Sequence, residues 1–263
     1  MENKEQQRFI DKILSFNLFD DTFMKAFFKG NKKATELMLR IILKKKDLTV
    51  KSVDTQSYMK NLQGRDVILD IVASDSKGIT YNIEIQKSDK GAEPKRARYH
   101  SSILDSNLLS PGQDFDDLPE TFVIFITEND YLGRGEPLYL IERRYEDNNE
   151  FFEDGEHIIY VNGTNKDSSM ELGKLMHDFS CSEPDDMNYK VLAERARYLK
   201  KTKKGMDTMG WSIAEIKQEA TDERNEEIAM NLIKLGKITL EDIAEETDLP
   251  VEKIRELAGE KAV

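Results

Sequence analysis

The sequence has few of the side chains that bind soft metal ions or form cross-links. Its 263 residues include one cysteine, Cys181, and three histidines, His100, His157 and His177. A single cysteine excludes an internal disulfide and a cysteine-based zinc cluster, and no two histidines have HxxxH spacing. Any bound metal is therefore expected to have oxygen ligands, which points to Mg²⁺ or Mn²⁺. The low cysteine content is typical of a reducing, cytoplasmic setting.

Long apolar runs and an excess of positive charge are also missing. No run approaches the roughly 20 apolar residues of a membrane-spanning helix, and the opening segment MENKEQQRF lacks the apolar stretch of a signal peptide. Lys and Arg total 39 against 51 Asp and Glu, a formal net charge of −12. Because dedicated nucleic-acid binders are usually basic, this balance argues against strong non-specific DNA binding. It leaves room for a local basic groove.

Hydrophobic periodicity predicts a mixed α/β or α+β domain followed by helices. In the first part of the chain we expect helices over 5–46, with a break at Gly30-Asn31, and over 93–109. Strands are expected at 50–58, 67–73, 79–85, 121–127, 138–142 and 157–161. The later part predicts only helices, at 171–179, 186–199, 211–235 and as a pair within 238–258. We therefore expect a first domain over residues 1–165 and an all-helical extension over 166–263.

A β-hairpin is predicted over residues 67–85. Its apolar strands contain two carboxylates, Asp70 and Glu84, and Gln86 follows directly after the second strand. Buried carboxylates are unfavourable unless they are paired, hydrogen-bonded or bound to a cation. Glu84 and Gln86 share one strand face, and a turn centred near Ser76 places Asp70 diagonally across from Glu84. The pattern predicts a divalent-metal site on a hairpin. A solvated strand face is the alternative.

Five short motifs follow one another in a characteristic order. They are DDTFM at 20–24, GR at 64–65 with LD at 69–70, YNIEIQ at 81–86, RARYH at 96–100 and LPETFVIFIT at 118–127. Over roughly residues 18–165 this set resembles the Rpn-type recombination-promoting nucleases and putative transposases of the PD-(D/E)XK superfamily. The resemblance implies a restriction-endonuclease-like core, a mixed sheet flanked by helices, and Mg²⁺-dependent hydrolysis of DNA linked to recombination or transposition.

The resemblance also implies roles for individual residues. Asp70 matches the motif aspartate and Glu84 the acidic position, so both, with the backbone carbonyl of Ile85, are expected to bind Mg²⁺ or Mn²⁺. Gln86 stands where the superfamily usually has lysine; glutamine can orient a water or a phosphate oxygen but carries no charge, so we interpret the site as a variant. Asp21 matches an acidic position at the start of the first helix and can complete the metal site; a helix N-cap is its alternative role.

Basic residues follow the hairpin. Lys95, Arg96 and Arg98 open the predicted helix after it and are expected to contact DNA phosphates, with a solvated helix face as the alternative. Lys87 comes directly after Gln86 but lies on the opposite strand face, so it is not an obvious substitute for the missing lysine.

The tail over residues 239–258 has a helix-turn-helix pattern, with Thr239 as an N-cap and Asp248 at the turn. Between residues 226 and 263 five Lys or Arg face ten Asp or Glu, a balance of −5. Binding a phosphate backbone needs the opposite sign. A hairpin that binds a partner or self-associates, giving a homo-oligomer, is therefore favoured over one that reads DNA.

These observations predict a cytoplasmic, metal-dependent DNA endonuclease that needs Mg²⁺ or Mn²⁺, acts on DNA, has no contact with membranes and uses no small organic cofactor. The alternative is a non-enzymatic interaction protein that keeps the nuclease fold with weak or no turnover and recruits a partner through its helical tail. A weaker third interpretation is a DNA-binding regulator that acts through the tail.

Overall fold

The computed structural model describes residues 2–60, 66–88, 91–236 and 238–259. The chain forms two compact units, divided between Met209 and Gly210, and each is described by itself. None of the helices in the described ranges is long and apolar enough to cross a membrane.

Three helices open the first unit: α1 (Glu2–Ser15), α2 (Asp21–Phe28) and α3 (Lys32–Leu43). The predicted break at Gly30-Asn31 is confirmed, because Gly30 has a positive φ of 63° and the Asn31 side chain accepts the Ala34 N–H at the start of α3. A second break, which the sequence pattern did not predict, separates α1 from α2. There Asn17 and Asp20 accept backbone N–H groups of the turn instead of continuing the helix.

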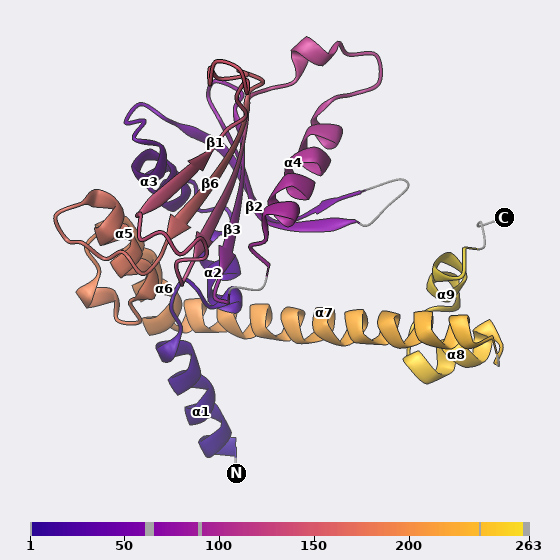
Figure 1. The fold of residues 1–263 in the computed structure, drawn as a ribbon. Coiled ribbons are helices and arrows are strands. Elements are labelled where there is room, and N and C mark those ends of the chain that lie inside the picture. The colour runs from indigo at the N-terminus through magenta and orange to yellow at the C-terminus, as the bar shows by residue number, and fades with distance from the viewer. Residues whose placement is uncertain (1, 61–65, 89–90, 237, 260–263) are drawn as a thin grey trace. The chain divides into compact units, whose positions relative to one another are not determined.

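One six-stranded sheet forms the centre of this unit (Figure 1), with strand order β1-β2-β3-β4-β6-β5. The strands are β1 (Val50–Met59), β2 (Val67–Asp75), β3 (Thr80–Gln86), β4 (Thr121–Thr127), β5 (Leu138–Ile141) and β6 (Glu156–Asn162). The neighbouring strands β3, β4 and β6 run parallel, while β1, β2 and β5 join antiparallel. Every residue of β4 is buried, as its continuous apolar sequence predicts.

Helices cover both faces of the sheet. The helix α4 (Pro94–Leu108) and the 3₁₀ helix η1 (Phe115–Asp117) connect β3 to β4. Figure 1 shows α4 on one side of the sheet and α3 and α5 (Glu171–Ser180) on the other. Under α4, Ala97 packs against Phe125 of β4 and Tyr160 of β6. The mixed sheet flanked by helices confirms the predicted α/β fold class.

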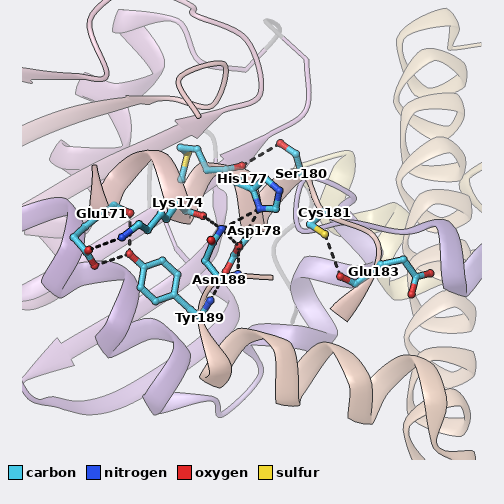
Figure 2. A network of polar contacts seen from close by, with 10 residues as sticks. Glu171, Lys174, His177, Asp178, Ser180, Cys181, Glu183, Asn188 and Tyr189 are labelled. Atoms are coloured by element: carbon cyan, nitrogen blue, oxygen red, sulfur yellow. Dashed lines mark hydrogen bonds and ion pairs between the residues drawn. The ribbon is translucent and has the colours of Figure 1, made fainter. Parts of the chain in front are cut away.

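The first unit continues beyond the expected boundary at residue 165, because α5, the 3₁₀ helix η2 (Pro184–Asp186) and α6 (Lys190–Lys201) pack onto it. The fully buried Lys200 of α6 donates to the backbone carbonyls of Leu14 in the last turn of α1, of Phe16 just after that helix, and of Ser182. Figure 2 shows a second link, in which Asp178 of α5 receives hydrogen bonds from the residues just before α6.

The second unit is entirely helical in its described residues. The long helix α7 (Lys203–Leu235) begins in the first unit and continues into the second, followed by α8 (Leu240–Thr247) and α9 (Val251–Leu257). The predicted cap at Thr239 is confirmed, since its side chain accepts the Asp242 N–H in a reciprocal capping box. Asp248 adopts the left-handed conformation at the turn, with φ of 53°. Ala229, Ile243, Ala244 and Ile254 form the buried core of this unit.

Candidate active site

Two carboxylates face each other where β2 and β3 stop pairing. The ladder runs from Ser74 opposite Thr80 to Ile71 opposite Ile83. Continuing this register by one residue places Asp70 directly opposite Glu84. The expected diagonal arrangement is therefore wrong. A turn centred on Ser76 would place Asp70 opposite Asn82, whereas the observed turn is centred on Lys77 and places Asp70 opposite Glu84.

Each carboxylate bonds to the backbone of the other strand. Glu84 Oε1 accepts the Asp70 N–H at 3.3 Å, and Asp70 Oδ2 accepts the Ile85 N–H at 3.2 Å. Glu84 is completely buried, and its Oε2 has no hydrogen-bond partner. A buried carboxylate oxygen without a hydrogen bond is unfavourable, so this atom favours a cation as its neighbour.

Burial is the main reason why the pKa of Asp70 lies well above its usual range, and the nearby carboxylates of Glu84 and Asp21 raise it further. The Ile85 N–H and the ammonium group of Lys25 act in the opposite direction and are too weak to reverse the shift. The site thus concentrates negative charge in a poorly solvated place, and a divalent cation would relieve that repulsion.

Asp21 is the first residue of α2, and its charge acts on Asp70. Its side chain is 55% exposed and forms an ion pair with Lys25 at 3.1 Å. The N-cap of α2 is Asp20, so the alternative role of Asp21 as an N-cap is wrong. Asp20 in turn accepts a hydrogen bond from the Lys87 ammonium group at 2.6 Å. Lys87 therefore pairs with Asp20 and not with Asp70 or Glu84.

Gln86 and Arg96 converge at Gly91. A Cβ atom added at Gly91 would lie 2.9 Å from Gln86 Oε1 and 3.0 Å from Arg96 Nη1. Gly91 also has a φ of 99°, a conformation that L side chains rarely adopt. A glycine at this position therefore lets the ends of both side chains reach the same small region.

Arg96 connects α4 to the acidic pair. Its Nη2 lies 3.6 Å from Glu84 Oε2, and its Nε–H donates to His100 Nε2 at 3.2 Å. His100 is buried, with Nδ1 at 3.4 Å from Glu84 Oε1 and 3.3 Å from the Asn82 amide nitrogen. Asn82 is also buried, and its Oδ1 has no hydrogen-bond partner. Polar side chains of α4 and β3 thus surround Glu84.

The predicted phosphate contacts do not form one group. Lys95 and Arg98 are exposed on α4, whereas Arg96 turns toward Glu84. The sequence interpretation assigned no role to the side chains of Asn82, Lys25 or His100. A signal for Asn82 was present, since it lies two residues before Glu84 on the same face of an apolar strand. His100 lies four residues after Arg96, the spacing that places two side chains on one helix face.

The donor set suits an ion that prefers oxygen. Asp70, Glu84 and backbone carbonyl groups are the ligand types typical of Mg²⁺ and Mn²⁺. Within the described ranges no three His, Cys, Asp or Glu side chains form a complete metal cluster. Water or phosphate oxygens would have to complete the coordination, as is usual for Mg²⁺.

The comparison with protein families agrees with this arrangement. The family model described as PD-(D/E)XK nuclease family transposase matches residues 18–175. No curated protein and no solved structure matches the chain. The matched range includes Gly64 and Arg65, which lie outside the described residues, as well as the strands that carry Asp70 and Glu84. With more than half of its length matched, the chain belongs to the PD-(D/E)XK nuclease family transposases.

Proposed function

We propose that this protein is a metal-dependent DNA endonuclease of the recombination-promoting, transposase-like type. The observation that carries the proposal is the opposed pair of Asp70 and Glu84, with a buried Glu84 oxygen that lacks a hydrogen bond. Family membership supports nuclease chemistry in general. The activity, its metal dependence and the DNA substrate are the content of the proposal.

Asp70 and Glu84 would hold Mg²⁺ or Mn²⁺, which when bound stabilises charge on the phosphate and lowers the pKa of a water. Ile85 directs its N–H toward Asp70. Because the N–H and C=O of one strand residue point to the same side, the Ile85 carbonyl faces the same neighbour and can serve as a further ligand. The charge of Asp21 acts on Asp70, which supports a place for it at the edge of the site.

In this proposal Gln86 orients the attacking water or a phosphate oxygen. Lys95, Arg96 and Arg98 contact phosphates of the DNA. Hydrolysis forms a bond between the water oxygen and phosphorus and breaks one phosphodiester P–O bond. The leaving oxygen takes up a proton, so the products are a phosphate monoester and a hydroxyl group.

Incubation of the purified protein with supercoiled plasmid tests the proposal. We expect nicked or linear DNA with Mg²⁺ or Mn²⁺ and none with EDTA. Asp70→Ala and Glu84→Gln should each lower the rate at least about 100-fold, since both remove a ligand of the ion that stabilises the transition state. The matched control is Asp185→Asn, an exposed carboxylate paired with Arg197 and Lys201. Cleavage that persists in EDTA or in Asp70→Ala would contradict the mechanism.

The alternative, a nuclease fold used only for interaction, has two observations in its favour. The usual lysine is replaced by Gln86, and the net charge of −12 opposes DNA binding. The same experiment separates the two functions. A folded protein that cleaves with neither Mg²⁺ nor Mn²⁺ would favour the alternative.

The acidic tail has a separate place in the proposal. We infer that residues 239–258 bind a partner protein or a second copy and do not read DNA, because their charge is unfavourable for a phosphate backbone. Removal of residues 238–263 should leave DNA binding unchanged. It should lower the mass of the assembly in solution by more than the mass of the deleted residues, because the contact with a second copy or a partner is lost. A loss of DNA binding would contradict this role.

A further inference from the structure

The chain has Gln86 at the position where the superfamily usually has lysine, and among the described residues three basic side chains lie near enough to the acidic pair to be considered. Two of them already have acidic partners: Lys87 forms an ion pair with Asp20, and Lys25 forms one with Asp21. The third is Arg96. We propose that Arg96, positioned against Gln86 over Gly91, supplies the positive charge that faces the scissile phosphate. This inference rests on the proposed nuclease function and assigns Arg96 a role inside the site, beyond a peripheral DNA contact.

The position of the guanidinium group supports this role. Arg96 Nη2 lies 3.6 Å from Glu84 Oε2, which is close for an ion pair and longer than a hydrogen bond. The Arg96 side chain is 41% exposed although Glu84 is completely buried. Of the five N–H groups of a guanidinium, one donates to His100, while Nη1 lies toward Gly91 and the end of Gln86 and Nη2 lies toward Glu84. The N–H groups on Nη1 and Nη2 therefore face the site. They are available for two oxygens of a phosphate.

Gln86 and Arg96 together replace the functions of one lysine. Lysine combines a positive charge with hydrogen-bond donors at a single atom. Here the amide of Gln86 comes from β3 and the charge of Arg96 from α4, and Gln86 Oε1 and Arg96 Nη1 both reach the space over Gly91. A side chain at Gly91 would displace the ends of both side chains, and the φ of 99° itself favours glycine there.

His100 is the positioning residue for Arg96. An arginine Nε–H can only donate, so His100 Nε2 must accept it and a neutral His100 carries its proton on Nδ1. Because Nδ1–H cannot accept from the Asn82 amide nitrogen, this tautomer requires the Asn82 amide to turn its oxygen toward the ring. Nδ1 faces Glu84 Oε1 at 3.4 Å. The imidazole therefore fixes Arg96 on one side and contacts the acidic pair on the other, and its ring also lies near Phe125, at 6.0 Å between centroids.

A substitution cycle tests the charge. Arg96→Ala should lower the plasmid cleavage rate about 100-fold or more, the usual effect of removing one group that stabilises transition-state charge. Adding Gln86→Lys to Arg96→Ala should restore much of the loss, because it returns a positive charge to the site from β3. Guanidinium ion added to Arg96→Ala should also raise the rate. Arg197→Ala, an exposed arginine on α6, is the matched control. A rate unchanged by Arg96→Ala, or a loss that neither lysine nor guanidinium reverses, would overturn the proposal.

Two binding measurements remain informative even if the wild-type protein does not cleave DNA. Calorimetry with Mn²⁺ should show a few-fold tighter binding by Arg96→Ala, because a positive charge next to Glu84 opposes the ion. Fluorescence anisotropy with a short duplex in Ca²⁺ should show weaker binding and a salt slope reduced by about one. If cleavage is absent but both shifts occur, the proposed function fails and the role of Arg96 is supported. If both affinities are unchanged, Arg96 is not in the site.

The role of His100 has its own readout. His100→Gln keeps an oxygen that can accept the Arg96 Nε–H, whereas His100→Ala has none. We expect Gln to retain most of the rate and Ala to approach the rate of Arg96→Ala. Equal rates for the two variants would overturn the positioning role.

Discussion

Asp70 combines two properties that oppose each other in the protein without metal. It is a candidate metal ligand, and its burial next to Glu84 and Asp21 raises its pKa. A carboxyl group whose pKa is higher in the folded than in the unfolded state binds its proton more tightly when folded. Below the pKa of the unfolded state the carboxyl is protonated in both states and does not lower the free energy of unfolding. As the pH rises from there through the pKa of the folded state, the free energy of unfolding falls.

Asp70→Asn should therefore stabilise the protein in EDTA at neutral pH. We expect its free energy of unfolding at pH 7.5 to exceed that of the wild type, because the neutral amide avoids the cost of an ionised carboxylate that is buried beside Glu84. The difference should shrink toward pH 4, where the wild-type carboxyl is protonated. Urea unfolding at the two pH values measures it, with the exposed Asp54→Asn as control. A variant less stable than the wild type at pH 7.5 would contradict the shift.

Some of these residues could be predicted from the sequence and others could not. Asp70 and Glu84 interrupt apolar strands, and a carboxylate in such a place requires a partner. The contact between Arg96 and Glu84 depends on how α4 lies over β3, which local patterns do not specify. The one-residue shift of the turn has a similar cause, since Asp75 accepts the N–H groups of Lys77 and Ile79 and so fixes the turn further along the chain.

At the scale of elements, the junction of α5 and α6 explains why the first unit extends past residue 165. Asp178 is completely buried and accepts the N–H groups of Asn188 at 2.7 Å and Tyr189 at 2.8 Å. These N–H groups lie just before and at the N-cap of α6. The negative charge is also favourable at a helix N-terminus. Asp178 thus fixes the start of α6 against the end of α5 (Figure 2).

Asp178→Ala should destabilise the first unit by about 1–3 kcal/mol, because it leaves the partly buried N–H groups of Asn188 and Tyr189 without their acceptor. Thermal unfolding followed by circular dichroism should show a fall of several degrees in the midpoint. Asp185→Ala removes an exposed carboxylate with two ion pairs and should change stability by less than about 1 kcal/mol. Similar effects of the two substitutions would contradict the capping role.

At the same junction, hydrophobic periodicity alone does not predict where α6 begins. The pattern predicts the second of these helices from residue 186, whereas α6 begins at Lys190. Residues Pro184–Asp186 form η2 instead, and Asp178 holds the N–H groups that precede α6. A buried side chain ten residues earlier decides this helix start, so a local pattern places it too early. The fully buried strand β4 needs no such contact and follows its apolar run closely.

At the scale of the whole molecule, the two units have separate cores. Ile254 of α9 is completely buried with Ile243 and Ala244 of α8 and Ala229 of α7. Each residue lies in the second unit, which starts at Gly210. The sequence pattern predicts this helical pair well, because Thr239 and Asp248 determine its local geometry. It cannot place the division between the units, which depends on long-range packing of α5 and α6.

Ile254→Asp should unfold the pair α8–α9 and leave the first unit intact, because a charge in so small a core has no partner. Hydrogen exchange followed by mass spectrometry should show lost protection in peptides from residues 240–257 and unchanged protection in peptides from β3 and β4. Glu252→Gln, at an exposed position of α9, is the control. If the tail only recruits a partner or a second copy, Ile254→Asp should also keep the wild-type rate of plasmid cleavage. Lost protection in β3 and β4 would show instead that the first unit depends on the core of the second.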